Sequence, residues 1–323
     1  MSQGLRTPRR YAGTALTGAA SQADLGARGS LRVVSWNLQF CGGRAEPYFY
    51  EGGTRVRVPA ADQARALRGV VDVLRALDAD VVLLQEVDRG SRRTDGADQL
   101  AVLLHDLPGY AAVSAAVHRN RFVPYPWPPL GRMNLHVATL SRSSPCLSSR
   151  ISLPGLHEPK LRAWFNLHRA LLTTGFRLAD GRTLQVGNTH LSAFSGGDDT
   201  LPRQLRIVGE WLANAGATAI LGGDFNLLPP GDNADRLPSD RDDHPRDRTE
   251  IDAFFATHAS VLPPVEQLKS GTGTYLPPGA TGPDRTLDWI FTSAHLRPIR
   301  AWVEAVDPFV SDHWPVVADL ALA

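Results

Sequence analysis

The sequence predicts an α/β domain in which two mixed β-sheets pack face to face and helices cover their outer sides. Three observations lead to this fold class. Apolar, β-rich runs outnumber the segments with helical spacing. Some of these runs are joined by a tight turn, whereas others are separated by a helix, which is typical of mixed sheets. A chain of 323 residues, 43% of them hydrophobic, is also long enough to bury a large core.

Charge and cysteine content narrow the class of protein. With 34 basic and 33 acidic residues, the chain has a net charge of +1 and no overall field that would attract nucleic acid. Its two cysteines, Cys41 and Cys146, exclude a disulfide framework. No apolar run approaches about 18 residues, the length of a membrane span. We expect a soluble, globular monomer.

The first 29 residues differ in composition from the rest of the chain. They combine basic residues with a weakly apolar stretch of Ala, Thr and Gly. A secretory signal peptide needs a denser apolar block, so we expect no standard signal and a cytoplasmic protein. Residues 1–29 are predicted to form a flexible tail, and residues 30–323 a single folded domain.

The first part of this domain alternates between strands and helices. Residues 31–40 are an apolar, β-rich run that we predict to be the first core strand, and a loop rich in glycine, aromatics and arginine follows it. Apolar residues recur at helical spacing over residues 62–77, which predicts an amphipathic helix. Residues 81–87 are predicted to form a second buried strand, and residues 97–107 a short helix.

The middle of the chain contains a proline-rich stretch and a hairpin. Residues 120–134 combine prolines with large aromatic side chains, and we expect a loop because proline cannot donate to a central strand. A strand is predicted at residues 136–142. Two β-rich runs, residues 169–178 and 182–191, are joined through Asp180-Gly181, a two-residue turn signal that predicts a β-hairpin.

A short apolar run with two glycines at its end organises the third part. In the sequence AILGGDFNLLPP, residues 219–230, Asp224 and Asn226 directly follow the glycines. Side chains alternate along an extended backbone, so these two share one side, although the same residues also favour turns. A helix is predicted before this run at residues 201–215, and a mobile charged loop after it at residues 231–250.

The C-terminal part is predicted to contain one short helix at residues 252–259 and three strands. Each strand is an apolar run, and the three runs are TLDWIFTS, PIRAWVEAV and WPVVADLAL. They cover residues 286–293, 298–306 and 314–322.

Eight polar residues follow or interrupt the apolar runs. Any one of them has an ordinary alternative, because a single Glu after a strand is usually solvated and a single His is usually structural. As a set they combine hard oxygen donors, which suit Mg²⁺ or Mn²⁺, with two histidines that could supply an acid and a base. This combination predicts metal-assisted hydrolysis of a phosphoester. The residues are Asn37, Glu86, His190, Asp224, Asn226, Asp288, Asp312 and His313.

Six short motifs in order carry a family resemblance: WN, LLQEVD, NTHL, GGDFN, LDWIF and SDHWPV. With these motifs the chain resembles the endonuclease/exonuclease/phosphatase superfamily, which contains DNase I, AP endonucleases, inositol polyphosphate 5-phosphatases and neutral sphingomyelinases. The resemblance implies a four-layered αββα sandwich and a catalytic domain over residues 30–323. It also implies Mg²⁺-dependent hydrolysis by metal-activated water and a His/Asp pair. The NTHL motif resembles the DNase, sphingomyelinase and small bacterial hydrolase branches more than the AP endonucleases.

The resemblance implies a role for each matching position. Glu86 corresponds to the principal metal ligand, Asn37 lies beside it, and Asp312 ligates or supports the metal. Asn134 and Arg169 stand where relatives commonly hold polar residues that contact the substrate, although Arg169 could also be an ordinary arginine at a strand edge.

The remaining five residues correspond to the catalytic positions. His313 is expected to act as general base or to bind the phosphate, polarised by Asp288. Asp224 and Asn226 are expected to place the attacking water and the scissile phosphate. His190 is expected to protonate or stabilise the leaving side.

Three functions remain open from the sequence. We expect a phosphodiester or phosphomonoester hydrolase that acts on a small molecule or a lipid head group. A DNase-like nuclease is the alternative, and an inactive binding module of the same fold is the third. In the stretch RFVPYPWPPLGR, the aromatic residues Phe122, Tyr125 and Trp127 could form an apolar rim for peripheral membrane contact or could simply cover the core.

Overall fold

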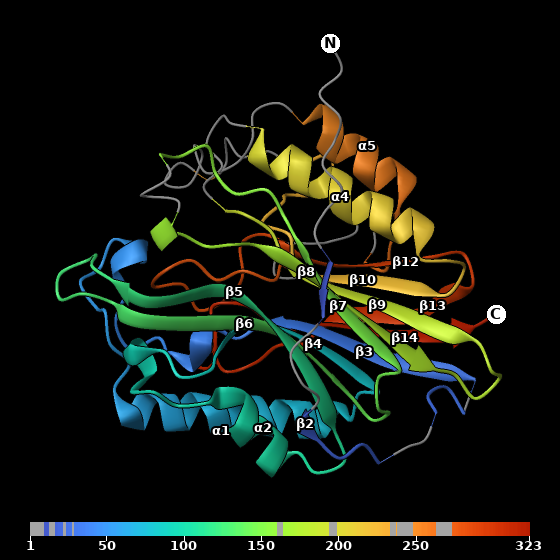
Figure 1. Cartoon of the computed structure of the whole chain (residues 1–323), viewed down its shortest axis with the longest axis horizontal. Helices are drawn as coiled ribbons and strands as arrows, with labels where there is room; N and C mark the ends of the chain where they lie inside the picture. The colour runs from blue at the N-terminus through green and yellow to red at the C-terminus, as the bar shows by residue number, and fades with distance from the viewer. Residues whose placement is uncertain are drawn as a thin grey trace.

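Two seven-stranded β-sheets pack face to face in the computed structural model of the chain, and helices cover the outer side of each sheet (Figure 1). This arrangement is the αββα sandwich that was predicted, so the fold class is confirmed. The structure describes residues 10–12, 17–21, 24–27, 29–159, 164–193, 199–232, 237, 248–262 and 273–323.

The first sheet contains the predicted hairpin and the strand that precedes Asp224. The hairpin is confirmed: its two strands pair antiparallel, and Gly181 in the turn has a φ of 86°. The next strand runs parallel to the second strand of the hairpin. In sheet order, the strands are β1 (Arg10–Ala12), β7 (Leu147–Ser152), β8 (Ala170–Arg177), β9 (Thr183–His190), β10 (Ala219–Asp224), β12 (Asp288–Thr292) and β11 (Ala259–Ser260).

The second sheet contains the first two predicted core strands, which run parallel to each other. In sheet order, its strands are β13 (Leu296–Val303), β14 (Val316–Leu322), β3 (Ser30–Asn37), β4 (Val81–Asp88), β6 (Gly131–Ser141), β5 (Ala111–Val123) and β2 (Thr17–Gly18). Short 3₁₀ turns η1 (Gln39–Cys41), η2 (Phe49–Glu51) and η3 (Arg92–Thr94) lie in the loops beyond β3 and β4.

Four helices of the described residues form the outer layers, and each matches a predicted helix. Helices α1 (Ala60–Leu77) and α2 (Gln99–Asp106) cover the second sheet, and α4 (Thr200–Asn214) and α5 (Thr249–Thr257) cover the first (Figure 1). Within the described ranges, none of the helices combines the length and the apolar character needed to cross a bilayer.

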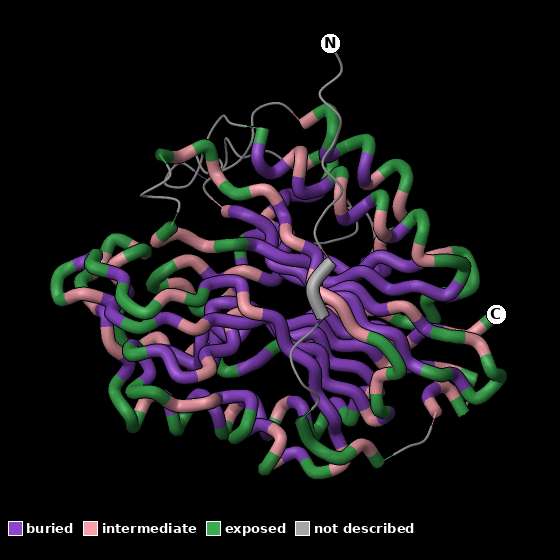
Figure 2. Tube along the Cα trace, in the orientation of Figure 1, coloured by how far each residue is buried: buried purple, intermediate pink, exposed green. Residues whose placement is uncertain are grey.

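Burial on both faces explains why the central strands read as continuous apolar runs. Val33 on β3 belongs to the cluster between the sheets, whereas its neighbour Val34 belongs to the cluster under α1 and α2. Leu83 and Leu84 on β4 divide in the same way. Because alternate side chains enter two different apolar layers, no polar face remains on these strands. Figure 2 shows the buried residues concentrated in the strands.

The stretch over residues 120–134 differs from the predicted loop. Strand β5 continues to Val123 and β6 begins at Gly131, so the irregular part is limited to residues 124–130. The prolines fall inside that turn and interrupt no ladder. Strand β5 itself was not predicted, because alanines and polar residues separate its three valines and leave no dense β-branched run.

Two predicted segments, residues 231–250 and 1–29, are described only in part. In the charged stretch 231–250, residues 233–236 and 238–247 lie outside the described residues. The predicted mobility of that loop therefore stays a prediction. Within residues 1–29, β1 pairs with β7, β2 pairs with β5, and Leu25 is fully buried in the core. The division of the chain at residue 30 stays a prediction.

Strand register brings the polar strand ends together at one edge of the sandwich. On β10, Asp224 is the register partner both of His190 on β9 and of Asp288 on β12. Across the interface, the Nε2 amide of Gln85 on β4 donates to Oδ1 of Asn188 on β9 at 2.8 Å, and both side chains are buried. This polar contact links the two sheets close to their polar edge, and it fixes how they align.

Gly223 is required for the close approach of β10 to β9. A Cβ there would lie 1.9 Å from the carbonyl oxygen of Thr189, and the residue has a φ of 148°. We expect Gly223→Ala to lower the free energy of unfolding by about 1–3 kcal/mol or more, because backbone cannot move aside as a flexible side chain can. Denaturant unfolding measures this loss. Gly282→Ala is the control, since its Cβ would meet no atom within 4 Å, and equal losses for both variants would contradict the prediction.

Candidate active site

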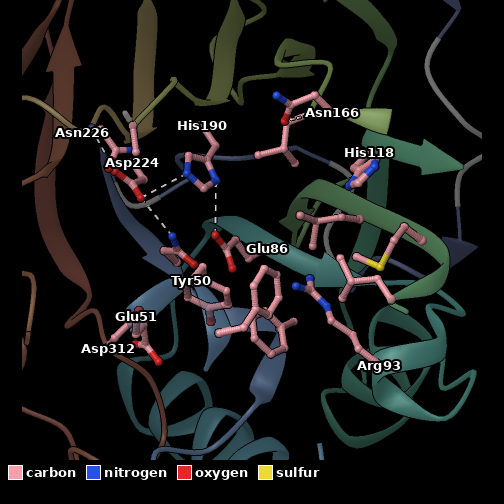
Figure 3. Close-up of a pocket in the computed structure, with 18 of the residues that line it drawn as sticks. Tyr50, Glu51, Glu86, Arg93, His118, Asn166, His190, Asp224, Asn226 and Asp312 are labelled. Atoms are coloured by element: carbon pink, nitrogen blue, oxygen red, sulfur yellow. Dashed lines mark hydrogen bonds and ion pairs between the residues drawn. The ribbon is translucent and has the colours of Figure 1, made fainter. Parts of the chain in front are cut away.

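A cavity of about 1060 Å³ opens at the edge of the sandwich where the polar strand ends meet (Figure 3). Eight of the ten predicted site residues line it, contributed by both sheets. They are Asn37, Glu86, Arg169, His190, Asp224, Asn226, Asp312 and His313. Asp288 lies behind His313, and Asn134 does not line the cavity.

Asp224 is the buried centre of the polar group. Its Oδ2 accepts a hydrogen bond from Nδ2 of Asn37 at 2.9 Å, and its Oδ1 accepts one from the backbone N–H of Asn226 at 2.9 Å. Asn226 has a φ of 53°, a left-handed conformation that asparagine tolerates. Burial raises the pKa of Asp224 to about 7, and the charge of His313 opposes that rise. The carboxyl is therefore poised to exchange a proton near neutral pH.

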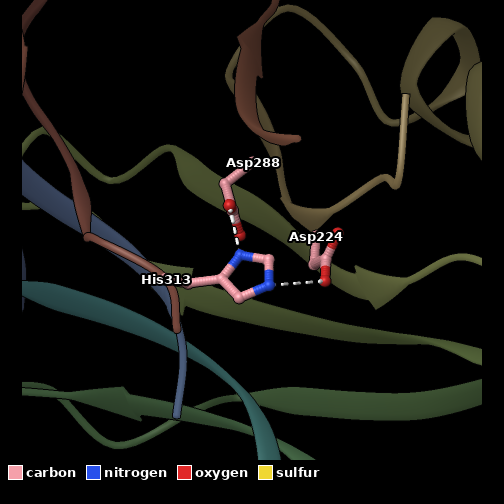
Figure 4. A group of neighbouring side chains, drawn as sticks. All are labelled: Asp224, Asp288 and His313. Carbon is pink, nitrogen blue, oxygen red and sulfur yellow. Dashed lines mark hydrogen bonds and ion pairs between the residues drawn. The ribbon is translucent and has the colours of Figure 1, made fainter. Parts of the chain in front are cut away.

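His313 and Asp288 form a buried pair. Nδ1 of His313 lies 2.6 Å from Oδ2 of Asp288, which places the Nδ1 proton between them (Figure 4). The backbone of His313 is also fixed, because its carbonyl accepts from Nε1 of Trp36 at 2.7 Å and its N–H donates to Oγ of Ser311 at 3.1 Å. Nε2 is left facing Asp224, 3.7 Å from its Oδ2.

The charge state of His313 follows from its neighbours. Burial lowers its pKa, but the carboxylates of Asp288, Asp224 and Asp312 outweigh burial and raise the pKa to about 10. The imidazole is consequently protonated at neutral pH, with one N–H held by Asp288 and the other directed at the cavity.

His190 is held in the opposite state. Its Nε2 lies 3.4 Å from Oδ2 of Asp224, and its Nδ1 lies 3.9 Å from Oε1 of Glu86. Burial, together with the positive charges of Arg169 and His313, lowers its pKa well below the usual value. A neutral and a charged histidine therefore face the same carboxylate, a separation that is typical of acid–base sites.

Three further carboxylates, those of Glu51, Glu86 and Asp312, line the same cavity (Figure 3). Burial raises the pKa of Asp312 to about 7, and the nearby charges of Glu86 and Glu51 raise it further. Burial also raises the pKa of Glu51. The charges of His313 and Arg44 oppose the rise at Asp312 only in part, and hard oxygen donors of this kind fit a divalent cation such as Mg²⁺ or Mn²⁺. The residues present therefore fit the predicted metal site of Asn37, Glu86 and Asp312.

A second group of residues could also hold an ion. One potential ligand atom from each of Asp224, Asp288 and His313 lies within 4.8 Å of the others. The short hydrogen bond between His313 and Asp288 already occupies one such atom of each residue. Carboxylates outnumber cations in this part of the site as well.

Arg169 brings a buried positive charge into the cavity. Its side chain is 5% exposed, and its Nη1 has no hydrogen-bond partner among the described residues. Burial lowers its pKa to about 10, still far above neutral, so the guanidinium keeps its charge. A buried cation with an unused N–H is costly unless a ligand satisfies it, so Arg169 is suited to bind an anion.

Asn134 takes a different position from the one expected. Its Nδ2 donates to the carbonyl oxygen of Arg89 at 2.6 Å, and its Oδ1 lies 3.0 Å from Nε2 of His136. These contacts join β6 to the end of β4. The assignment of Asn134 to substrate binding stays a prediction.

Several cavity residues were not predicted from the sequence. Some lie in the loop at residues 41–59, where the gathering of aromatics and arginine was the only signal, and others lie on β5 or in irregular segments. The polar ones are Tyr50, Glu51, Arg93, His118, Asn166, Tyr275 and Arg285.

The chain matches the profile of a known family over most of its length. The profile of the Endonuclease/Exonuclease/phosphatase family matches residues 34–313. A UPF0294 protein of Yersinia enterocolitica is 42% identical over 69 residues, which span 21% of this chain and only 25% of that protein.

Solved structures share the fold. The endonuclease/exonuclease/phosphatase from Beutenbergia cavernae has a TM-score of 0.63 and 23% identity, over 91% of this chain and 72% of that one. The mannosyl-6-phosphatase of Bacteroides thetaiotaomicron has a TM-score of 0.56 and 19% identity, over 90% of this chain and 99% of that one. At these identities, the likeness shows the fold.

The pairing with Asp288 predicts a measurable titration of His313. In chelator-treated protein, NMR should show the imidazole protonated from pH 6 to 8, and Asp288→Asn should lower its pKa by about 1–3 units. Since the folded pKa lies above the usual 6.5, the pair's contribution to stability is complete below pH 6.5 and is lost as pH rises towards 10. An imidazole that is neutral at pH 7 in the wild type would contradict this assignment.

Proposed function

This chain belongs to the endonuclease/exonuclease/phosphatase family, and from that premise we propose that it is a Mg²⁺- or Mn²⁺-dependent phosphoesterase acting on a small molecule or a lipid head group. Members of the family are metal-dependent phosphoesterases. One observation carries the proposal: a single cavity holds carboxylates that are short of a cation beside a buried arginine that is short of an anion. A metal-bound phosphoester would satisfy both.

The proposed metal ligands are Glu86 and Asp312, with Asn37 beside them. A divalent cation at this position would polarise the phosphoryl group and lower the pKa of a bound water. Arg169 would hold the phosphate from the opposite side with its unused N–H. These assignments are supported by the burial and the charge balance of the four side chains.

The buried residues supply the proton chemistry. Asp224, held by Asn37 and Asn226, would orient the attacking water and accept its proton. His313 would donate from Nε2 to a phosphoryl oxygen while Asp288 keeps it charged. His190 would gain a proton when the phosphate binds, because an anion offsets the charges of Arg169 and His313 that lower its pKa. It could then pass that proton to the leaving oxygen.

The choice of substrate is tested by a direct screen. Purified protein with Mg²⁺ would be assayed against plasmid DNA, sphingomyelin, phosphoinositides and bis(p-nitrophenyl) phosphate. Hydrolysis of a small or lipid phosphoester supports the proposal. Cleavage of DNA alone would favour the nuclease alternative, and no hydrolysis of any substrate would favour the inactive binding module.

Glu86 is the residue on which metal binding should depend. We expect Glu86→Gln to lower hydrolysis of the best substrate by about 100-fold or more, since even the partners of metal ligands contribute 10–100-fold. The Mg²⁺-induced rise in unfolding temperature should disappear in the same variant, whereas the unfolding temperature of the metal-free protein should barely move.

The exposed Glu210 on α4 supplies the matched control for this substitution. Glu210→Gln should leave both activity and the Mg²⁺ effect unchanged. If Glu86→Gln retains the thermal response to Mg²⁺ while Asp224→Asn loses it, the ion is held by Asp224, Asp288 and His313 instead. Full activity after thorough chelation would contradict the metal requirement altogether.

The His313–Asp288 pair should act as one unit in catalysis. His313→Ala, Asp288→Asn and the double variant should each lose about 100-fold or more in kcat, with nearly equal losses, because residues that act together are not additive. An exposed pair of the same type, His105 and Asp106 at 2.8 Å, provides the control. Substitutions there should have no effect. Losses at His313 and Asp288 that multiply would show that the two residues act independently.

A further inference from the structure

The cavity has an apolar compartment that the proposed chemistry does not use. Its wall comes from the ends of β5 and β6 and from the segment before β8, and His118 and Arg93 lie well away from Asp224 and Asn226 (Figure 3). The apolar lining residues are Val123, Leu130, Met133, Leu135, Phe165 and Leu167. A volume of about 1060 Å³ far exceeds the needs of a phosphate group and is that of a pocket for a whole small molecule.

Two polar side chains, Asn166 and His118, lie in this compartment (Figure 3), and the amide of Asn166 is already bonded to Glu158 and to the N–H of Leu167. The side chain of His118 is 6% exposed, and its Nε2 has no hydrogen-bond partner among the described residues. The other ring nitrogen bonds to the backbone of Phe165, and burial lowers the pKa of the imidazole to about 4, so the ring is neutral. With its proton used at Phe165, His118 presents Nε2 to the cavity as an acceptor.

Arg93 does not make the compartment a second anion site. Its Nε and Nη2 donate to the two carboxylate oxygens of the fully buried Asp88 at 2.8 and 3.1 Å. The guanidinium also lies 3.6 Å from the ring centroid of Phe40. Because Asp88 balances its charge and stacking on Phe40 fixes its position, Arg93 is a fixed part of the cavity wall. The compartment is therefore apolar with one unsatisfied hydrogen-bond acceptor.

The compartment also reaches the surface beside exposed aromatic side chains. Tyr125 lines the cavity and yet is 73% exposed, and Phe122 and Trp127 on the same hairpin are 50% and 88% exposed. The alternative that these aromatics cover the core is therefore wrong. An apolar group that is longer than the compartment would therefore contact these aromatic side chains rather than water.

We propose that this compartment binds the alcohol portion of the phosphoester substrate, an apolar chain or ring system that carries a hydroxyl or amide N–H donating to Nε2 of His118. The inference rests on the proposed function, because it assigns the phosphate to the other end of the same cavity. The side chains on β5 and β6 would select the substrate by its alcohol portion, and the residues at the strand ends around Asp224 would carry out the hydrolysis.

Non-hydrolysable phosphonates test the compartment without turnover. Dissociation constants would be measured by calorimetry, with Mg²⁺, for methyl-, propyl- and heptylphosphonate. Affinity should rise about tenfold or more from propyl to heptyl, since each buried methylene contributes up to about fourfold. Met133→Trp, which fills the compartment, should abolish the rise and leave methylphosphonate binding unchanged. Leu130→Ser provides a second variant that should weaken the rise, and Val102→Trp on the surface of α2 is the control.

The donor is tested with heptylphosphonates that carry one hydroxyl at successive positions. At least one should bind the wild type more tightly than plain heptylphosphonate, and His118→Phe should remove that advantage while keeping the dependence on chain length. No advantage at any position would overturn the role of His118.

The two proposals fail in different ways. No gain with chain length, in a protein that binds methylphosphonate and hydrolyses a phosphoester, would overturn the compartment alone. The opposite result is also possible: affinity rises with chain length, Met133→Trp abolishes the rise, and the protein hydrolyses no phosphoester. That result would overturn the proposed function and support the compartment as a binding site for an apolar group.

Discussion

The site depends on one buried carboxylate, that of Asp224, and on the polar partners that surround it. Asp224 is 1% exposed, and its two oxygens are held by Asn37 from β3, His190 from β9 and Asn226 just beyond β10. Burying such a group is costly unless its partners are placed in advance. The register of β9, β10 and β12 and the stacking of the two sheets perform that placement, so the fold and the site form together.

The charge balance around Asp224 separates the protonation states of two identical side chains. His313 is surrounded by carboxylates and keeps its proton, whereas His190 shares its surroundings with Arg169 and loses it. Neither state is a property of histidine itself. The same arrangement leaves the negative charge near Asp312 and the positive charge of Arg169 only partly balanced by their neighbours, so a ligand of mixed charge would complete the electrostatics of the site.

The sequence predicted what depends on local pattern and missed what depends on packing. Strands that end in a polar residue could be recognised, and register then brought Asn37, His190 and Asp224 together. Asn134 does not line the cavity, and the reason is its position on the strand: Met133 and Leu135 on either side of it line the cavity, so the side chain between them points to the other face of β6. His118 could not be found, because the alanines of β5 give a weak strand signal and Phe165, which closes the compartment beside it, lies more than 40 residues away in the sequence.

The contact between Gln85 and Asn188 has a consequence for how such a protein can change. It bridges the two sheets beside the polar edge, and Asn188 also donates to the carbonyl oxygens of Ala138 and Leu84. Sliding one sheet by a single residue would break all three bonds at once, so these bonds fix the position of the polar edge. The β5–β6 turn takes no part in them. Over evolutionary time the turn is free to vary in length and in side chains, and the preferred substrate can therefore shift without the catalytic residues having to be rebuilt.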